Sequence, residues 1–194
     1  KYDSSFYYSA KAKEIYTEHK DTLGLINATN SIGIYYLNTN QQEKASESFT
    51  QIKTLAQQAN KDVYLAMAYT NLGVIDMGQS KYNAALEKFL HALSIYQDQD
   101  SSHRLINIYV NLGSLFLSTN NYEKSIDYFF RGLKIAEDIN DNYHRWYIYY
   151  NLGFVYEHKK EYKKALEYAE KSIDLAKISN NDLDLAYGYL ADRK

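Results

Sequence analysis

The sequence predicts an all-α fold, a right-handed α-solenoid of antiparallel helix pairs with about ten helices. The first observation is a period, since the tripeptide Asn-Leu-Gly at residues 71–73 returns at 111–113 and again at 151–153, 40 residues apart each time. The second is that the 194 residues contain no proline and only 8 glycines, so nothing interrupts a helical pattern. The third is that apolar residues recur at steps of three and four, which places them on one face of a helix.

Each 40-residue unit splits into two amphipathic stretches, which we call helix A and helix B. The period predicts one continuous array over residues 1–194. Its parts are an orphan helix B at 2–20, repeat 1 at 21–60, repeat 2 at 61–100, repeat 3 at 101–140, repeat 4 at 141–180 and a partial helix A at 181–194.

Polar residues recur where each helix A is expected to begin, and their side chains can accept hydrogen bonds from the unpaired amides of a helix start. These predicted caps are Thr22, Asp62, Ser102, Asn142 and Asp182. Further along helix A, a tyrosine precedes the Leu-Gly pair in repeats 2 to 4, and we expect it in the core. These core tyrosines are Tyr69, Tyr109 and Tyr149.

Short polar segments at residues 38–40, 78–80, 118–120 and 158–160 are expected to turn the chain into helix B. A small residue follows the repeated glycine at a fixed distance, as Ala85 follows Gly73. Glycine inside a helix costs about 1 kcal/mol relative to alanine, so its return at every period indicates a packing gain. We therefore expect helices A and B to approach closely at this point.

These residues resemble the tetratricopeptide repeat family, in which an aromatic residue, Leu-Gly, a second aromatic residue and a distant alanine recur. The resemblance covers nearly the whole chain and is closest in repeats 2 to 4, where Tyr-x-x-Leu-Gly is followed by Tyr82, Tyr122 or Tyr162. The period is 40 residues here, whereas the family's usual period is about 34. The extra residues lie between Ala92 and Tyr109, so we expect a longer helix B and a longer following helix A.

The resemblance implies that helix A lines a concave groove that binds a protein or peptide segment. We transfer the family's groove positions to the matching positions of each repeat. The resulting candidate groove residues are uncharged, with amides in the first repeats and aromatic rings in repeat 4. They are Asn27, Asn30, Asn71, Asn107, Asn111, Tyr147, Tyr150, Asn151, Phe154 and His158.

Two interpretations of these residues stay open. An asparagine amide donates and accepts at once, which suits it to a peptide backbone, but the amides can equally bond to a neighbouring helix. Aromatic side chains contribute strongly to binding energy, but the rings of repeat 4 can instead pack against the next helix A.

Several function classes are not supported by the sequence. The net charge is −2, and the sequence contains no stripe of basic residues that would indicate nucleic-acid binding. With no cysteine, and with five histidines that form no pair at helical metal-ligand spacing, we expect no metal site, no cofactor and no enzyme activity. The sequence contains no apolar run long enough to predict membrane insertion. We expect a soluble segment, which is either cytoplasmic or belongs to the periplasmic part of a membrane-tethered regulator.

The sequence therefore predicts a protein- or peptide-binding scaffold that is the sensory or interaction region of a larger signalling or transcription-regulatory protein. Its low-proline composition rich in Lys, Asn and Tyr is similar to repeat regions of Bacteroidetes sensor proteins. The alternative is a structural module that self-associates through its end helices as a homo-oligomer, because an array without capping repeats exposes apolar faces.

Overall fold

The computed structural model describes residues 2–99 and 101–178. Within these residues the chain forms nine α-helices and no strand, which confirms the all-α prediction. The helices are α1 Tyr2–Glu18, α2 Thr22–Asn38, α3 Gln42–Gln58, α4 Asp62–Gly78, α5 Tyr82–Asp98, α6 Ser102–Ser118, α7 Tyr122–Asp138, α8 Asn142–His158 and α9 Tyr162–Ile178. The predicted partial helix A at 181–194 lies outside the described residues.

All nine helices have the same length of 17 residues. Residues 92–98 belong to α5 and residues 102–109 to α6, so the extra length of the repeat lies in the helices as predicted. The middle residue of the other connections has a positive φ, from 51° to 61°, and asparagine occupies four of these positions. Asparagine tolerates this left-handed conformation better than most side chains, which explains its recurrence at the turns.

Four of the five predicted helix caps are wrong by one residue, and the fifth, Asp182, lies outside the described residues. Thr22, Asp62, Ser102 and Asn142 are the first residues of their helices, and the capping positions are the residues before them. Asp21 accepts a hydrogen bond from the amide of Gly24, and Asp141 accepts one from the amide of His144. A capping residue lies just before the helix, where its side chain can accept a hydrogen bond from the backbone amide of the third helical residue. The repeating pattern alone did not show which residue of each repeat holds this position.

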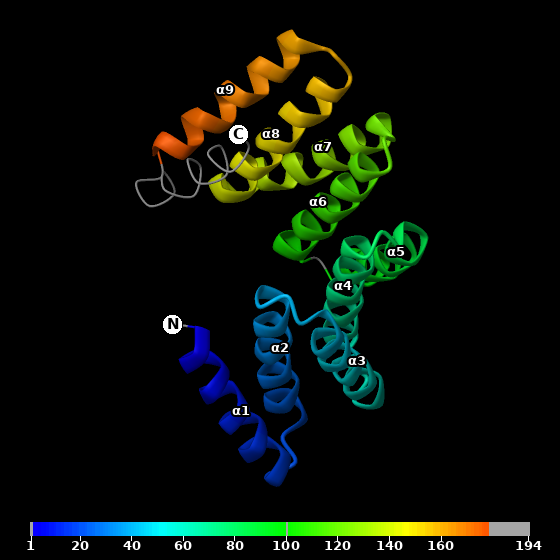
Figure 1. Ribbon diagram of the computed structural model, residues 1–194, viewed down its shortest axis with the longest axis vertical. Helices are drawn as coiled ribbons and strands as arrows, with labels where there is room; N and C mark the ends of the chain where they lie inside the picture. The colour runs from blue at the N-terminus through cyan, green and yellow to red at the C-terminus, as the bar shows by residue number, and fades with distance from the viewer. Residues whose placement is uncertain (1, 100, 179–194) are drawn as a thin grey trace. The chain divides into compact units, whose positions relative to one another are not determined.

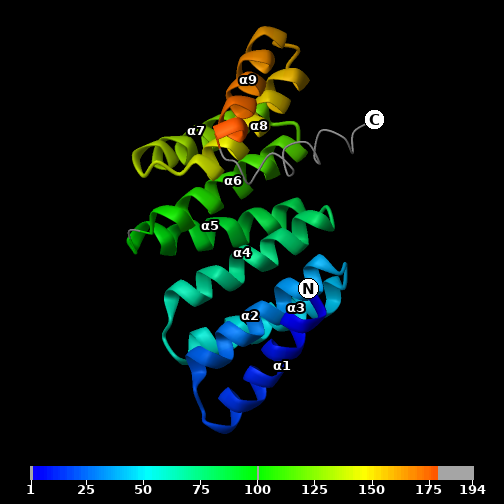
Figure 2. The same ribbon diagram turned by 90° about the vertical axis from the view of Figure 1, so that its left-hand side faces the viewer.

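The chain divides into two compact units at Asp100, which coincides with a predicted repeat boundary. Helices α1 to α5 form the first unit and α6 to α9 the second, and consecutive helices pack against each other within each unit (Figure 1). Turning the view by 90° shows α8 and α9 again as a pair of neighbouring helices (Figure 2).

The core of each unit forms where a helix A packs into the groove of the preceding pair. In the first unit, α4 inserts Leu72 and Ile75 against Phe49 of α3. In the second, α8 inserts Leu152 and Val155 against Phe129 of α7. This layered packing of helix pairs is the solenoid arrangement that the period predicted.

The prediction that three tyrosines lie in the core is only partly correct. Tyr109 and Tyr149 are buried, at 7% and 8% exposure. Tyr69 is half-buried instead, and its ring stacks on that of His91 with centroids 5.4 Å apart. Among the described residues, none of the helices is long and apolar enough to span a membrane.

Candidate binding site

The predicted groove residues all lie on the A helices, α2, α4, α6 and α8. In the first unit, the amide of Asn71 donates a hydrogen bond to Oδ1 of Asn30 at 3.3 Å, which links α4 to α2. Asn27 is exposed on α2. Of the three candidate groove asparagines in the first unit, two therefore connect a pair of helices and one faces solvent.

The three candidate groove asparagines of the second unit have different surroundings. The Asn107 amide donates to the carbonyl oxygen of His103 at 3.0 Å, and that of Asn151 donates to the carbonyl oxygen of Tyr147 at 2.8 Å. Asn111 is half-buried, and its amide has no hydrogen-bond partner within the described part of the chain. Of these three side chains, Asn111 has the most unused hydrogen-bonding capacity.

The aromatic residues of α8 form a connected cluster. The rings of Tyr150 and Phe154 meet edge to face with centroids 4.7 Å apart, and Trp146 stacks against Tyr150 at 6.2 Å. Tyr147 contacts Trp146 at 6.1 Å and is half-buried. His158, at the end of α8, is exposed, and its ring stacks on that of Tyr122 of α7 with centroids 6.0 Å apart.

This aromatic cluster borders an open cleft between α8 and α9 with a volume of about 460 Å³. From α8 it is lined by Trp146, Tyr150, Gly153 and Phe154. From α9 it is lined by Tyr162, Leu166, Ala169 and Ile173, among others. Among the described residues that line it, only Glu157 and Lys177 are charged, so the lining is mostly apolar.

The absence of one aromatic ring opens this cleft. In the preceding repeats a phenylalanine of helix B lies against the glycine of helix A, as Phe129 lies against Gly113. The corresponding pair in repeat 4 is Ala169 and Gly153, and both residues line the cleft. Space that Phe129 fills in repeat 3 is therefore open in repeat 4.

The same face is covered in the preceding repeat. Leu133 of α7, which packs in one cluster with Leu152 of α8, is 5% exposed, whereas its counterpart Ile173 of α9 is 43% exposed. Tyr162 and Leu166 of α9 are exposed as well, at 65% and 62%. The described residues thus leave an apolar surface on α9, and residues 181–194, predicted as the next helix A, lie outside them.

On the other side of this helix pair, two tyrosines are held in their neutral form. Burial raises the pKa of Tyr149, and its hydroxyl also donates to Oε1 of Glu137 at 3.1 Å, which raises the pKa further. Burial likewise raises the pKa of Tyr168, which stacks on Tyr156 with centroids 5.4 Å apart. These groups support packing between α7, α8 and α9, and they do not face the cleft.

The structure adds site residues that the sequence did not predict. Trp146, Tyr162, Leu166 and Ile173 line the cleft beside the predicted Tyr150 and Phe154. The sequence contained a signal for this cleft, because Ala169 stands at the phase of Phe49, Phe89 and Phe129. A missing ring at a position that is otherwise aromatic indicates a gap in the packing.

Comparison with known proteins agrees with this architecture. A family model for the tetratricopeptide repeat matches residues 64–138, and a second model of the same description matches residues 146–177, together more than half of the chain. No curated protein matches the sequence.

Several solved structures share the fold at low sequence identity. BtubC from P. vanneervenii is 20% identical with a TM-score of 0.73, over 82% of this chain and 66% of its own. A Rap protein complexed with Competence and Sporulation Factor is 15% identical with a TM-score of 0.71, over 91% of this chain and 59% of its own. A signal transduction ATPase with a tetratricopeptide repeat sensor from Pyrococcus horikoshii is 22% identical with a TM-score of 0.70, over 80% of this chain and 24% of its own.

The chain thus spans less than two thirds of each of these three structures. The matched family models, the repeated helix pairs and the glycine–phenylalanine contact between them lead to the same conclusion. The chain belongs to the tetratricopeptide repeat family.

Proposed function

We propose that this chain is a protein- or peptide-binding scaffold, and that its partner places an apolar side chain in the cleft between α8 and α9. The observation that carries the proposal is an aromatic cluster, the buried Trp146 and the half-buried Tyr150 and Phe154, at the edge of a cleft of about 460 Å³. Pockets of this size with mostly apolar linings are typical of binding sites.

The physical argument rests on what the cleft offers to a partner. Aromatic rings held by neighbouring rings give a large contact area at little cost in conformational entropy. Because Tyr150 and Phe154 are fixed edge to face, a partner side chain would meet a surface that is already ordered. Residues of this kind, near the centre of an interface, carry most of the binding energy.

We further propose that the partner extends from the cleft along the A helices of the second unit, where Asn111 can donate to and accept from its backbone. Apart from His158, the candidate groove residues are amides and aromatic side chains without formal charge at neutral pH. Recognition would then depend on apolar anchors and backbone hydrogen bonds, and an acidic or basic partner sequence would gain no specific advantage.

The wider role that we propose is the sensory or interaction region of a larger signalling or transcription-regulatory protein. Two of the similar structures support this proposal. One is a Rap protein in complex with Competence and Sporulation Factor, and the other is a signal transduction ATPase in which the tetratricopeptide repeat is the sensor. The proposal assigns this chain a binding role and no catalytic step.

The cleft supplies its own reporter, since Trp146 is the chain's single tryptophan. The experiment is affinity capture of partners with the wild-type chain and with the Tyr150→Ala/Phe154→Ala variant, followed by titration of the captured protein against Trp146 fluorescence. We expect the variant to lose the partner and the wild-type emission to shift on binding. Tyr8→Ala is the matched control, because Tyr8 is an aromatic residue of α1 with 70% exposure.

A second candidate function is self-association through the same face of α9. The exposure of Tyr162, Leu166 and Ile173 favours it, because exposed apolar surface of this kind is often buried between subunits. Light scattering over a range of concentrations separates the two functions. A dimer that Leu166→Glu converts to a monomer would support self-association, and a monomer at all concentrations would exclude it.

A further inference from the structure

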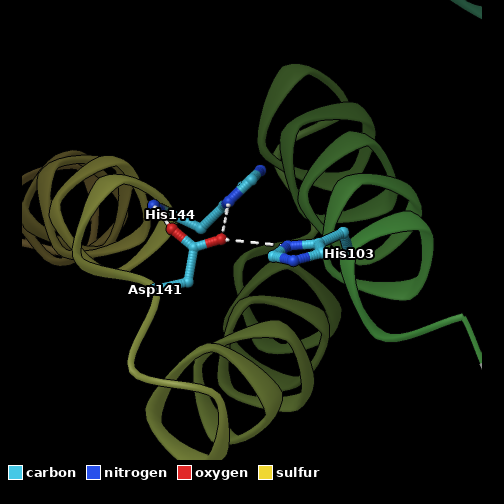
Figure 3. A group of neighbouring side chains, drawn as sticks. All are labelled: His103, Asp141 and His144. Atoms are coloured by element: carbon cyan, nitrogen blue, oxygen red, sulfur yellow. Dashed lines mark hydrogen bonds and ion pairs between the residues drawn. The ribbon is translucent and has the colours of Figure 1, made fainter.

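Three potential metal ligands from distant parts of the sequence meet in the second unit (Figure 3). His103 lies in the first turn of α6, His144 lies in the first turn of α8, and Asp141 caps α8. Oδ2 of Asp141 lies 2.6 Å from Nδ1 of His144 and 3.3 Å from Nδ1 of His103. One ligand atom from each residue lies within 4.8 Å of those of the other two.

The carboxylate of Asp141 is held in place by the helix that it caps. Its Oδ1 accepts the backbone amide of His144 at 3.0 Å, which leaves Oδ2 directed at the two imidazole rings. Asp141 therefore presents one carboxylate oxygen to both rings.

The ring of His144 is held from its other side by Asn107. The Asn107 amide nitrogen donates to the carbonyl oxygen of His103, so its oxygen faces Nε2 of His144, at 3.1 Å. Metal-bound histidines usually donate their second ring N–H to such an acceptor, which fixes the ring and exposes the other nitrogen to the metal. The amide oxygen of Asn107 therefore already provides the hydrogen-bond acceptor that orients the His144 ring.

Nothing in the repeat architecture requires this cluster. One repeat earlier, the corresponding positions carry Val63, Ser101 and Arg104. A further repeat earlier they carry Leu23, Lys61 and Tyr64. Neither set offers two nitrogen ligands and a carboxylate, so helix capping alone does not account for the combination in repeat 4.

We propose that His103, Asp141 and His144 form a site for a divalent transition metal, with Zn²⁺ as its occupant and water in the fourth position. Two imidazole nitrogens and one carboxylate oxygen are ligands that Zn²⁺ accepts, in a tetrahedral arrangement with bonds of about 2.0–2.2 Å. This site goes beyond the proposed binding of a protein partner and does not depend on it.

The distances fit such an ion after a small adjustment. Tetrahedral bonds of that length separate neighbouring ligand atoms by about 3.3–3.5 Å, and Oδ2 of Asp141 and Nδ1 of His103 are already 3.3 Å apart. The 2.6 Å contact between Asp141 and His144 is a hydrogen bond, so Zn²⁺ must replace its proton, which passes to the solvent. The His103 side chain is 72% exposed and can rotate toward the ion without disturbing the core.

An ion at this position would join the start of α6 to the start of α8. These two helices contact each other directly in the second unit, although their cluster residues are 41 positions apart in the sequence. Since the ion would bind the folded arrangement better than the unfolded chain, it would stabilise this unit.

The test uses the chain after removal of any purification tag and of bound metal, with Zn²⁺ titrated against a competing fluorescent chelator. We expect one Zn²⁺ per chain, a rise in melting temperature on saturation, and the strong visible absorption of tetrahedral cobalt when Co²⁺ is added instead. His103→Ala should reduce the affinity by more than about 100-fold, and Asn107→Ala by about 10- to 100-fold.

Two variants distinguish ligation from loss of structure. Asp141→Asn keeps a residue that caps helices well but removes the charged ligand, so it should fold normally and lose the metal. His91→Ala removes an exposed histidine of α5 and should leave the Zn²⁺ affinity and the number of ions bound unchanged. The proposal is overturned if the wild-type chain binds no Zn²⁺, or if His103→Ala and Asp141→Asn bind it as tightly as the wild type.

Discussion

Gly113 of α6 lies directly beneath the ring of Phe129 of α7, so that a Cβ atom on the glycine would be 2.7 Å from the ring carbons. The same contact joins Gly73 to Phe89, where the distance would be 2.6 Å. No real Cβ approaches another atom that closely, and the three phenylalanines of this series, Phe49, Phe89 and Phe129, are fully buried. The repeated glycine therefore makes room for an aromatic ring.

The first prediction compares two alanine substitutions at equivalent positions. In Gly113→Ala the new methyl group clashes with Phe129, and we expect a net loss of about 1 kcal/mol or more in the free energy of unfolding, despite alanine's better helix propensity. In Gly153→Ala the nearest atoms would be 3.5 and 3.7 Å away, an ordinary contact, so a gain of up to about 1 kcal/mol is expected. Urea unfolding measures both, and equal effects would contradict this account.

A second prediction restores the missing ring in repeat 4. In Ala169→Phe the new ring should lie against Gly153, as Phe129 lies against Gly113. We expect the free energy of unfolding to rise by about 1–2 kcal/mol, less than for full burial because the cleft is open. The emission of Trp146, which lines the cleft, should shift to shorter wavelength. A less stable variant with unchanged emission would mean that the ring does not enter the cleft.

The third prediction concerns alkaline pH. Burial and the contact with Glu137 raise the pKa of Tyr149, so the folded state favours the neutral hydroxyl. That contribution to stability is complete below the unfolded pKa of about 10 and is lost as the pH rises through the folded pKa. Tyr149→Phe should therefore weaken the fall in unfolding free energy above about pH 10. Tyr143→Phe, at an exposed tyrosine, is the control for the removal of a hydroxyl group.

The fourth prediction separates the two roles of the asparagines. Asn71→Ala removes the hydrogen bond to Asn30, so we expect it to cost about 0.5–1.5 kcal/mol of stability. Asn111→Ala removes no hydrogen bond within the described residues, so its stability should stay within about 0.5 kcal/mol of the wild type. If Asn111 contacts the partner, the same variant should bind it more weakly. A destabilised Asn111→Ala protein with normal binding would assign this amide to the fold.

The helices, their pairing and their turns were predictable from the sequence because each follows from residues close together in the chain. The recurrence of glycine in helix A indicated a close approach of two helices, and Gly113 confirms it. The partial exposure of Tyr69 was not predictable, since it depends on packing with His91 of the next helix.

The candidate sites were predictable only in part. Tyr150 and Phe154 were identified by their phase, but the cleft beside them arises from a residue that lacks a ring, Ala169, and its effect appears only in three dimensions. The spacing rule that excluded a metal site considered neighbours within one helix. It could not detect His103 and His144, which approach each other because α6 packs against α8.

The most direct test of the proposed function is the fluorescence of Trp146 during titration with a partner captured by the wild-type chain. The account predicts a saturable shift in emission for the wild type and for Tyr8→Ala, and no binding by Tyr150→Ala/Phe154→Ala, with all three proteins equally helical. Binding of equal affinity by the double variant would contradict the assignment of the partner to the cleft between α8 and α9.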